Sequence, residues 1–173
     1  TNSNSEMDAF MTTVPQYTLS YGGVEMSAPR YEQICYYDSA NSCYEMRFCD
    51  LLSYPFDKGG VEYKGLIEDG ELVITVPFKV LDDSSTQFEF SATDVKGTSK
   101  NGLNSVDGTG STAVYTTGTT PVDPPVDPSN KYFTLDMTTA VNKDDSSIID
   151  VVITIKDIKK ELCAVDFLLN FDD

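Results

Sequence analysis

Strict alternation of apolar and polar residues most constrains the fold of this 173-residue chain. It is clearest in ELVITVPFKVLDD (71–83). One face of that segment carries Leu72, Ile74, Val76, Phe78 and Val80, and the other carries Val73, Thr75, Pro77 and Lys79. A period of two predicts an extended strand with one buried face, because a helix face repeats every 3.6 residues instead. Pro77 has no amide N–H, so a bulge or a sheet edge is expected there.

The same pattern recurs along the chain, while helical periodicity is nearly absent. Further strands are expected at 43–52, 86–95, 111–117, 132–141, 147–158 and 163–171. In the last of these, Val165, Phe167, Leu169 and Phe171 share one face, opposite Ala164, Asp166, Leu168 and Asn170. Turn residues such as Asn-Gly and Asp-Gly separate the strands. The chain is therefore predicted to be all-β.

A proline- and aspartate-rich stretch divides the chain into two parts. TTGTTPVDPPVDPSN (116–130) suits neither helix nor sheet, so 119–130 is predicted to be an extended linker. The three strands expected after it are too few for a stable domain, so 131–173 must pack against something else. Read from 131–173 onward into 1–118, the strands form one run without an internal linker.

Charge and composition exclude several function classes. The chain has 28 acidic and 12 basic residues, a net charge of −16, and no histidine. Nucleic acids and anionic membranes need a basic footprint, and no apolar stretch is long enough to cross a bilayer. Without histidine, Ser-His-Asp and Cys-His catalysis are excluded, and no carboxylate pair is singled out. We therefore expect no enzyme activity, no cofactor and no metal site.

Four cysteines are present, without a Cys-x-x-Cys pair. Cys35 and Cys43 bracket the polar stretch YYDSANS and could close a short loop as a disulfide, or stay as thiols. Cys49 and Cys163 fall within expected strands, where a small buried thiol is the simplest interpretation.

Read from 131 onward, the chain resembles a cohesin, the β-sandwich module of cellulosome scaffolds that binds dockerins. LCAVDFLLNFDD (162–173) resembles the third cohesin strand, and MDAFMTTVPQ (7–16) resembles the fourth. YEMRFCDLLS (44–53) resembles the fifth strand, and IEDGELVITVPFKVLDD (67–83) resembles the sixth. FEFSATDVKGTSKNGLNSVDG (88–108) resembles the eighth strand with its following loop, and STAVYTTG (111–118) resembles the closing strand. The region 17–42 departs from a compact cohesin and is similar to an insertion.

The resemblance implies an all-β sandwich of jelly-roll, cohesin-like topology in a secreted bacterial surface protein. Residues 1–118 would be its C-terminal part, and 131–173 would be the N-terminal strands of the same sandwich or of the next one. The implied function is non-catalytic binding of dockerins on carbohydrate-active enzymes.

Cohesins bind dockerin through one sheet face, built from their strands eight, three, six and five. The resemblance places eight residues of this chain on that face: Ala164, Asp166, Leu168, Asn170, Val73, Thr75, Glu89 and Ser91. Asp166 matches a position where type I cohesins carry an aspartate that contacts the partner. Leu168 and Val73 would form an apolar centre beside it.

Three other functions stay open. The chain could be a structural repeat of a surface fibre, in which each tail completes a neighbouring copy by strand exchange. It could be a carbohydrate-binding module centred on the tyrosines of 17–42, which are Tyr17, Tyr21, Tyr31, Tyr36 and Tyr37. It could also be a pilin domain with an isopeptide bond, for which Lys156 and Asn170 have the required side chains.

Overall fold

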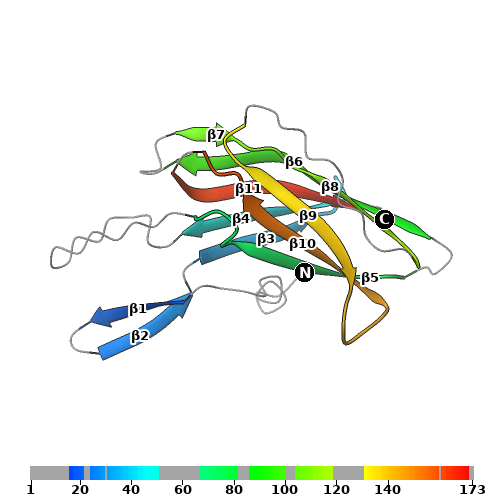
Figure 1. Cartoon of the computed structure of the whole chain (residues 1–173), viewed down its shortest axis with the longest axis horizontal. Helices are drawn as coiled ribbons and strands as arrows, with labels where there is room; N and C mark the ends of the chain where they lie inside the picture. Colours follow the sequence, from blue (N-terminus) through cyan, green and yellow to red (C-terminus); the bar gives the residue numbers. More distant parts are fainter. Residues whose placement is uncertain are drawn as a thin grey trace.

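Every regular element of the described chain is a β-strand, as the alternating pattern predicts. The computed structural model describes residues 16–21, 24–29, 31–50, 67–81, 86–99, 104–118, 131–159 and 161–171. Within them, two larger antiparallel sheets form two layers, and a separate two-stranded hairpin projects to one side (Figure 1). The predicted linker 119–130 and the segment 7–15 lie outside the described residues.

The smaller layer is a three-stranded antiparallel sheet. Its order is β5 (Val73–Lys79), β10 (Ile148–Lys156) and β9 (Thr134–Val141). Pro77 lies opposite Asp150, and the β5–β10 register runs past it without a shift. Of the two sequence-based alternatives for this proline, the edge position is therefore correct and the bulge is not.

The larger layer is a six-stranded antiparallel sheet. Its order begins with β3 (Tyr31–Asp38), β4 (Cys43–Asp50), β11 (Leu162–Phe171) and β6 (Gln87–Ser99). The far side of β6 pairs with two short strands, β7 (Ser105–Asp107) and β8 (Thr112–Thr116). The β11–β6 register shifts between Asp166 and Leu168, where Asp94 has a φ of 48°.

Both layers contribute to one hydrophobic core, as the period-two pattern requires. The three-stranded sheet supplies mainly Ile74, Val76, Leu135, Met137, Val151, Ile153 and Ile155. The six-stranded sheet supplies mainly Met46, Phe48, Phe90, Ala92, Val165, Phe167 and Leu169. Alternate residues of β5 and β10 are therefore buried, as alternation predicts, whereas β11 begins with four consecutive buried residues, 162–165.

The tail of the chain supplies inner strands to both sheets. β10 lies between β5 and β9, and β11 lies between β4 and β6. An isolated parallel bridge joins Thr109 to Thr134 at the start of β9. The segments before and after the predicted linker therefore build the same two layers.

The region 17–42 contains three strands that sequence reasoning did not predict. β1 (Gln16–Tyr21) and β2 (Val24–Pro29) form the separate hairpin. β3 instead belongs to the main sheet, where it pairs with β4 along all eight of its residues. A signal for this strand was present, because YEQICYYD contains three tyrosines and one isoleucine and is followed by the polar turn 39–42. Across the described residues, we find no helix with the length and apolar character needed to cross a membrane.

Candidate binding face

The outer face of the six-stranded sheet carries most of the predicted site residues. Asp166, Leu168 and Asn170 are partly exposed on β11, whereas Val165, Phe167 and Leu169 between them are buried in the core. Ala164 lies on the same outer face but is buried. The predicted outward orientation of this strand is therefore correct.

Asp166 is held by a cross-strand ion pair. It lies opposite Arg47 of β4, whose Nε donates a hydrogen bond to its Oδ1. The Arg47 side chain is 52% exposed, and the Asp166 side chain is 30% exposed. The bond with Asp166 raises the pKa of Arg47. A mid-strand aspartate thus has a structural reason here, since opposite charges on facing strands stabilise the pairing.

The charged row continues across β6 and β7. Lys96 lies opposite both Asp166 and Asp107, and its Nζ is 3.1 Å from Asp107 Oδ1. Lys131 approaches Asp107 to 3.8 Å, and Asp94 approaches Lys96 to 3.6 Å. The hydrogen bond and charge of Lys96 lower the pKa of Asp107 below its ordinary 3.8. Four neighbouring strands therefore carry alternating charges along one line.

Apolar side chains lie beside this charged row and at its β3 end, where Ile34 is opposite Arg47. Leu168 is opposite Glu45 of β4, which is opposite Tyr36 of β3. Tyr36 and Ile34, both on β3, are 49% and 44% exposed. Tyr36 donates a hydrogen bond to Glu45, which raises the pKa of the Tyr36 phenol. Sequence reasoning did not assign Ile34 or Arg47 to this face because it did not predict which strands are neighbours.

Asn170 and Ser91 lie at one end of the face. Asn170 Nδ2 donates to the Ser91 carbonyl oxygen at 3.2 Å and to Thr93 Oγ1 at 2.8 Å. Glu89 lies further along β6, opposite Val114 of β8. The predicted contribution of the 88–108 segment is thus placed in the same sheet as β11.

Val73 and Thr75 do not lie beside Asp166, contrary to the expectation. Both belong to β5, where they are opposite Thr154 and Val152 of β10 in the three-stranded sheet. Alternation predicted their side of the strand but not the sheet that the strand joins. The place next to β11 is occupied by β4 instead.

The cysteines are all free thiols. Cys35 lies opposite Met46, and Cys43 lies opposite Asp38, so the register places the two cysteines on opposite faces of the β3–β4 pair. The disulfide considered from the sequence is therefore not part of this fold. Burial raises the pKa of the Cys35 thiol to about 11.

The isopeptide alternative also fails on geometry. Lys156 forms an ion pair with Asp136, its neighbour in the three-stranded sheet. Asn170 lies in the other sheet and bonds to Ser91 and Thr93. The two side chains that the bond would join are therefore engaged on different layers.

Aromatic rings gather where the two layers meet at one end. Tyr44 and Phe171 stack with their centroids 5.5 Å apart, and Phe78 packs 5.0 Å from Phe171. Tyr37 covers this group from β3, 5.4 Å from Tyr44. Of the tyrosines considered for carbohydrate binding, Tyr37 is engaged here and Tyr36 binds Glu45; the side chains of Tyr17, Tyr21 and Tyr31 lie outside the described set.

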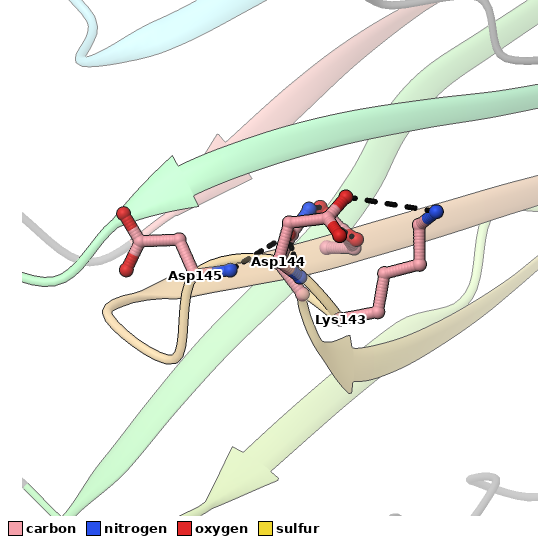
Figure 2. Close-up of polar contacts among 5 residues, drawn as sticks. Lys143, Asp144 and Asp145 are labelled. Atoms are coloured by element: carbon pink, nitrogen blue, oxygen red, sulfur yellow. Dashed lines mark hydrogen bonds and ion pairs between the residues drawn. The ribbon is translucent and has the colours of Figure 1, made fainter.

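The acidic β9–β10 turn is held together by its own groups (Figure 2). Asn142 Oδ1 accepts hydrogen bonds from the amides of Asp144 and Asp145, and Lys143 pairs with Asp144 at 3.6 Å. Ser147 donates to Asp145, which lowers the pKa of that carboxyl. The acidic residues therefore serve as turn formers.

In comparisons with protein-family models, curated protein sequences and solved structures, nothing matches this chain.

Proposed function

We propose that this chain is a non-catalytic protein-binding module with a jelly-roll, cohesin-like sandwich fold. It works in a secreted bacterial scaffold, and its partner is the dockerin module of a carbohydrate-active enzyme. The binding surface is the outer face of the six-stranded sheet, centred on Asp166 and Leu168.

The strand order is the observation that carries this proposal. A cohesin places strands eight, three, six and five in one sheet, and here β6, β11, β4 and β3 are neighbours in that order. The assignment requires β3 as the fifth strand and β4 as the sixth, replacing the segments 44–53 and 67–83 in those roles. A cohesin also sets its first and last strands side by side and parallel, which the bridge between Thr109 and Thr134 supports.

The composition of the face supports the same conclusion. Protein interfaces combine an apolar centre with a rim of polar and charged groups. Leu168, Ile34 and Tyr36 supply apolar surface on this face, where Glu45 lies between Leu168 and Tyr36 and the Arg47–Asp166 pair continues the row that begins at Ile34. A dockerin side chain can bond to the free lone pairs of Asp166 without breaking its pair with Arg47.

A charge inserted at the centre of the face tests the proposal. Titration calorimetry with a panel of calcium-loaded dockerins should yield one-to-one binding, which Leu168→Arg abolishes. Val73→Arg is the matched control, because Val73 faces outward on the three-stranded sheet. If Val73→Arg weakens binding and Leu168→Arg does not, the face is wrong. If no dockerin binds, the partner is wrong.

A second candidate is a fibre repeat assembled by strand exchange. The observation that favours it is the inner position of β10 and β11, which residues 1–118 cannot replace from their own described strands. The tail of a neighbouring copy could fill the same places with the same pairing. Light scattering over a wide concentration range tests this candidate. Masses above one chain that grow with concentration support exchange, and a monomer throughout contradicts it.

A further inference from the structure

The outer edge of β3 is long and has no partner strand among the described residues. β3 has eight residues and pairs only with β4 among the described strands. It contains neither proline nor lysine, which natural edge strands use to block further pairing. Ile34 and Tyr36 stand exposed along it on the outer side of the sheet. An edge of this kind presents unpaired backbone groups next to apolar side chains.

The other edges of the two larger sheets are each protected. β5 carries the exposed residues Pro77 and Lys79. The far side of β6 carries only short strands, β7 with three residues and β8 with five. The edge of β9 is met by Thr109, through hydrogen bonds of 2.9 Å to the Phe133 oxygen and 2.8 Å from the Leu135 amide. Among the described edges of the two layers, this contrast identifies β3 as the one best suited to accept a strand.

The charge along β3 indicates what kind of strand fits. Asp38 is the last residue of β3, and Glu45 of β4 lies opposite Tyr36. Among the described residues, Arg47 lies opposite Ile34, and it is engaged by Asp166. Antiparallel pairing of two β3 strands in the register centred on Cys35 is disfavoured, because it sets the acidic positions 38 and 32 opposite each other. Each copy also carries a net charge of −16.

We propose that the β3 edge accepts an extended segment of a different protein as an added antiparallel strand. That segment has apolar residues at two alternate positions, which pack beside Tyr36 and Ile34, and basic residues at the flanking alternate positions, opposite Asp38 and Glu32. Backbone hydrogen bonds provide the attachment, and the alternate side chains provide the selectivity. The attachment uses the backbone edge of β3 and therefore does not require dockerin binding, although Tyr36 and Ile34 also belong to the outer face around Leu168.

A peptide of sequence Lys-Thr-Val-Thr-Val-Thr-Lys, blocked at both ends, is the probe. Its lysines and valines fall opposite Asp38, Tyr36, Ile34 and Glu32 in the antiparallel register. Two control peptides replace both lysines by glutamate, or the central threonine by proline. Binding is measured by fluorescence polarisation, and hydrogen exchange reports on the amides of β3.

We expect saturable binding of the basic peptide, weakened by added salt, with new protection at alternate β3 amides. Both control peptides should bind at least about tenfold more weakly. Ile34→Lys should weaken binding by a similar factor, whereas Val141→Lys should leave it unchanged. Val141 is the matched control because it is 46% exposed, close to the 44% of Ile34. It lies on β9, in the other sheet.

Four results would overturn the proposal. They are no binding of the basic peptide at millimolar concentration, equal binding of the proline peptide, equal weakening by Ile34→Lys and Val141→Lys, and a doubled mass with protected β3 amides in the absence of peptide. The last would assign the edge to a second copy. The proline peptide keeps the test informative even if Ile34→Lys fails to fold.

Discussion

Asp94 adopts a backbone conformation that strands do not normally contain. Its φ of 48° lies in the left-handed region, at the register shift where β6 passes Asp166 and Leu168. Asparagine and aspartate tolerate this region, whereas β-branched residues do not. The bulge therefore explains an aspartate within a 13-residue strand, and it places a carboxylate at the centre of the proposed binding face.

A valine at position 94 should destabilise the protein even though valine favours strands. We expect Asp94→Val to lower the free energy of unfolding by about 1–2 kcal/mol, because the backbone must keep a positive φ. Asp94→Asn removes the same charge without that strain and should change it by less than about 0.5 kcal/mol. Urea unfolding measures both. A stabilised valine variant would show that the bulge is absent.

Thr139 carries a polar group that the core does not satisfy. It is 4% exposed, and its hydroxyl has no hydrogen-bond partner among the described residues. Replacement by valine keeps the shape and removes the uncompensated hydroxyl, so Thr139→Val should raise the free energy of unfolding by about 1 kcal/mol. Thr138→Val, on the outer side of β9, should have little effect. A loss of stability in Thr139→Val would mean that the hydroxyl has a partner in solution.

Residue orientation was predictable because it depends only on local alternation. The outward position of Asp166 followed from the sequence around it. Its pairing with Arg47 did not, because the two residues are 119 positions apart and meet only when β4 and β11 are neighbours. Long-range pairing is decided by the packing of whole sheets, which a single sequence does not encode as a local signal.

At the scale of elements, the sequence predicted strands better than their sheets. The segment 71–83 was recognised with its buried face, yet β5 joins the sheet opposite the one expected. Both sheets need strands with one apolar face, so alternation cannot distinguish between them. β3 was not predicted because 17–42 departs from a compact cohesin and resembles an insertion.

The connection into β8 depends on a close backbone approach at Gly110. A Cβ there would overlap the carbonyl oxygen of Ala92, whose amide bonds to the Ser111 oxygen at 3.0 Å. Backbone cannot shift cheaply, so Gly110→Ala should lower the free energy of unfolding by about 3 kcal/mol. Gly97→Ala meets only the side chains of Leu162, Phe133 and Val106 and should cost less. Thermal and urea unfolding rank the two variants; the reverse order would contradict this packing.

At the scale of the whole molecule, the two segments around the predicted linker form one structural unit. β10 pairs with β5 and β9, and β11 pairs with β4 and β6. Each of these two tail strands therefore has at least one neighbour from the segment before the linker. A protease site inserted within 119–130 tests this arrangement. After cleavage, the two fragments should elute together under native conditions and separate only in urea. Fragments that separate in native buffer would show that the tail contributes little to the fold.

Charge sets how the whole molecule responds to acid. The net charge is −16, and hydrogen bonds lower the pKa of Asp38, Asp107 and Asp145. A carboxyl with a lowered pKa in the folded state stabilises that state above its unfolded pKa, and this contribution is lost as pH falls through the folded pKa. Stability should therefore fall below about pH 4, where these carboxyls begin to bind protons.

A double-mutant cycle isolates this effect from net charge. The difference in unfolding free energy between the native chain and Asp107→Asn should be constant from pH 7 to about pH 5, then shrink below about pH 4. Lys96 is the main cause of the lowered pKa of Asp107, so in a Lys96→Gln background the same difference should be smaller and depend less on pH. Urea unfolding at four pH values measures both differences. If the Lys96→Gln background leaves the pH dependence unchanged, the charged row across β6 and β7 does not couple these two side chains in solution.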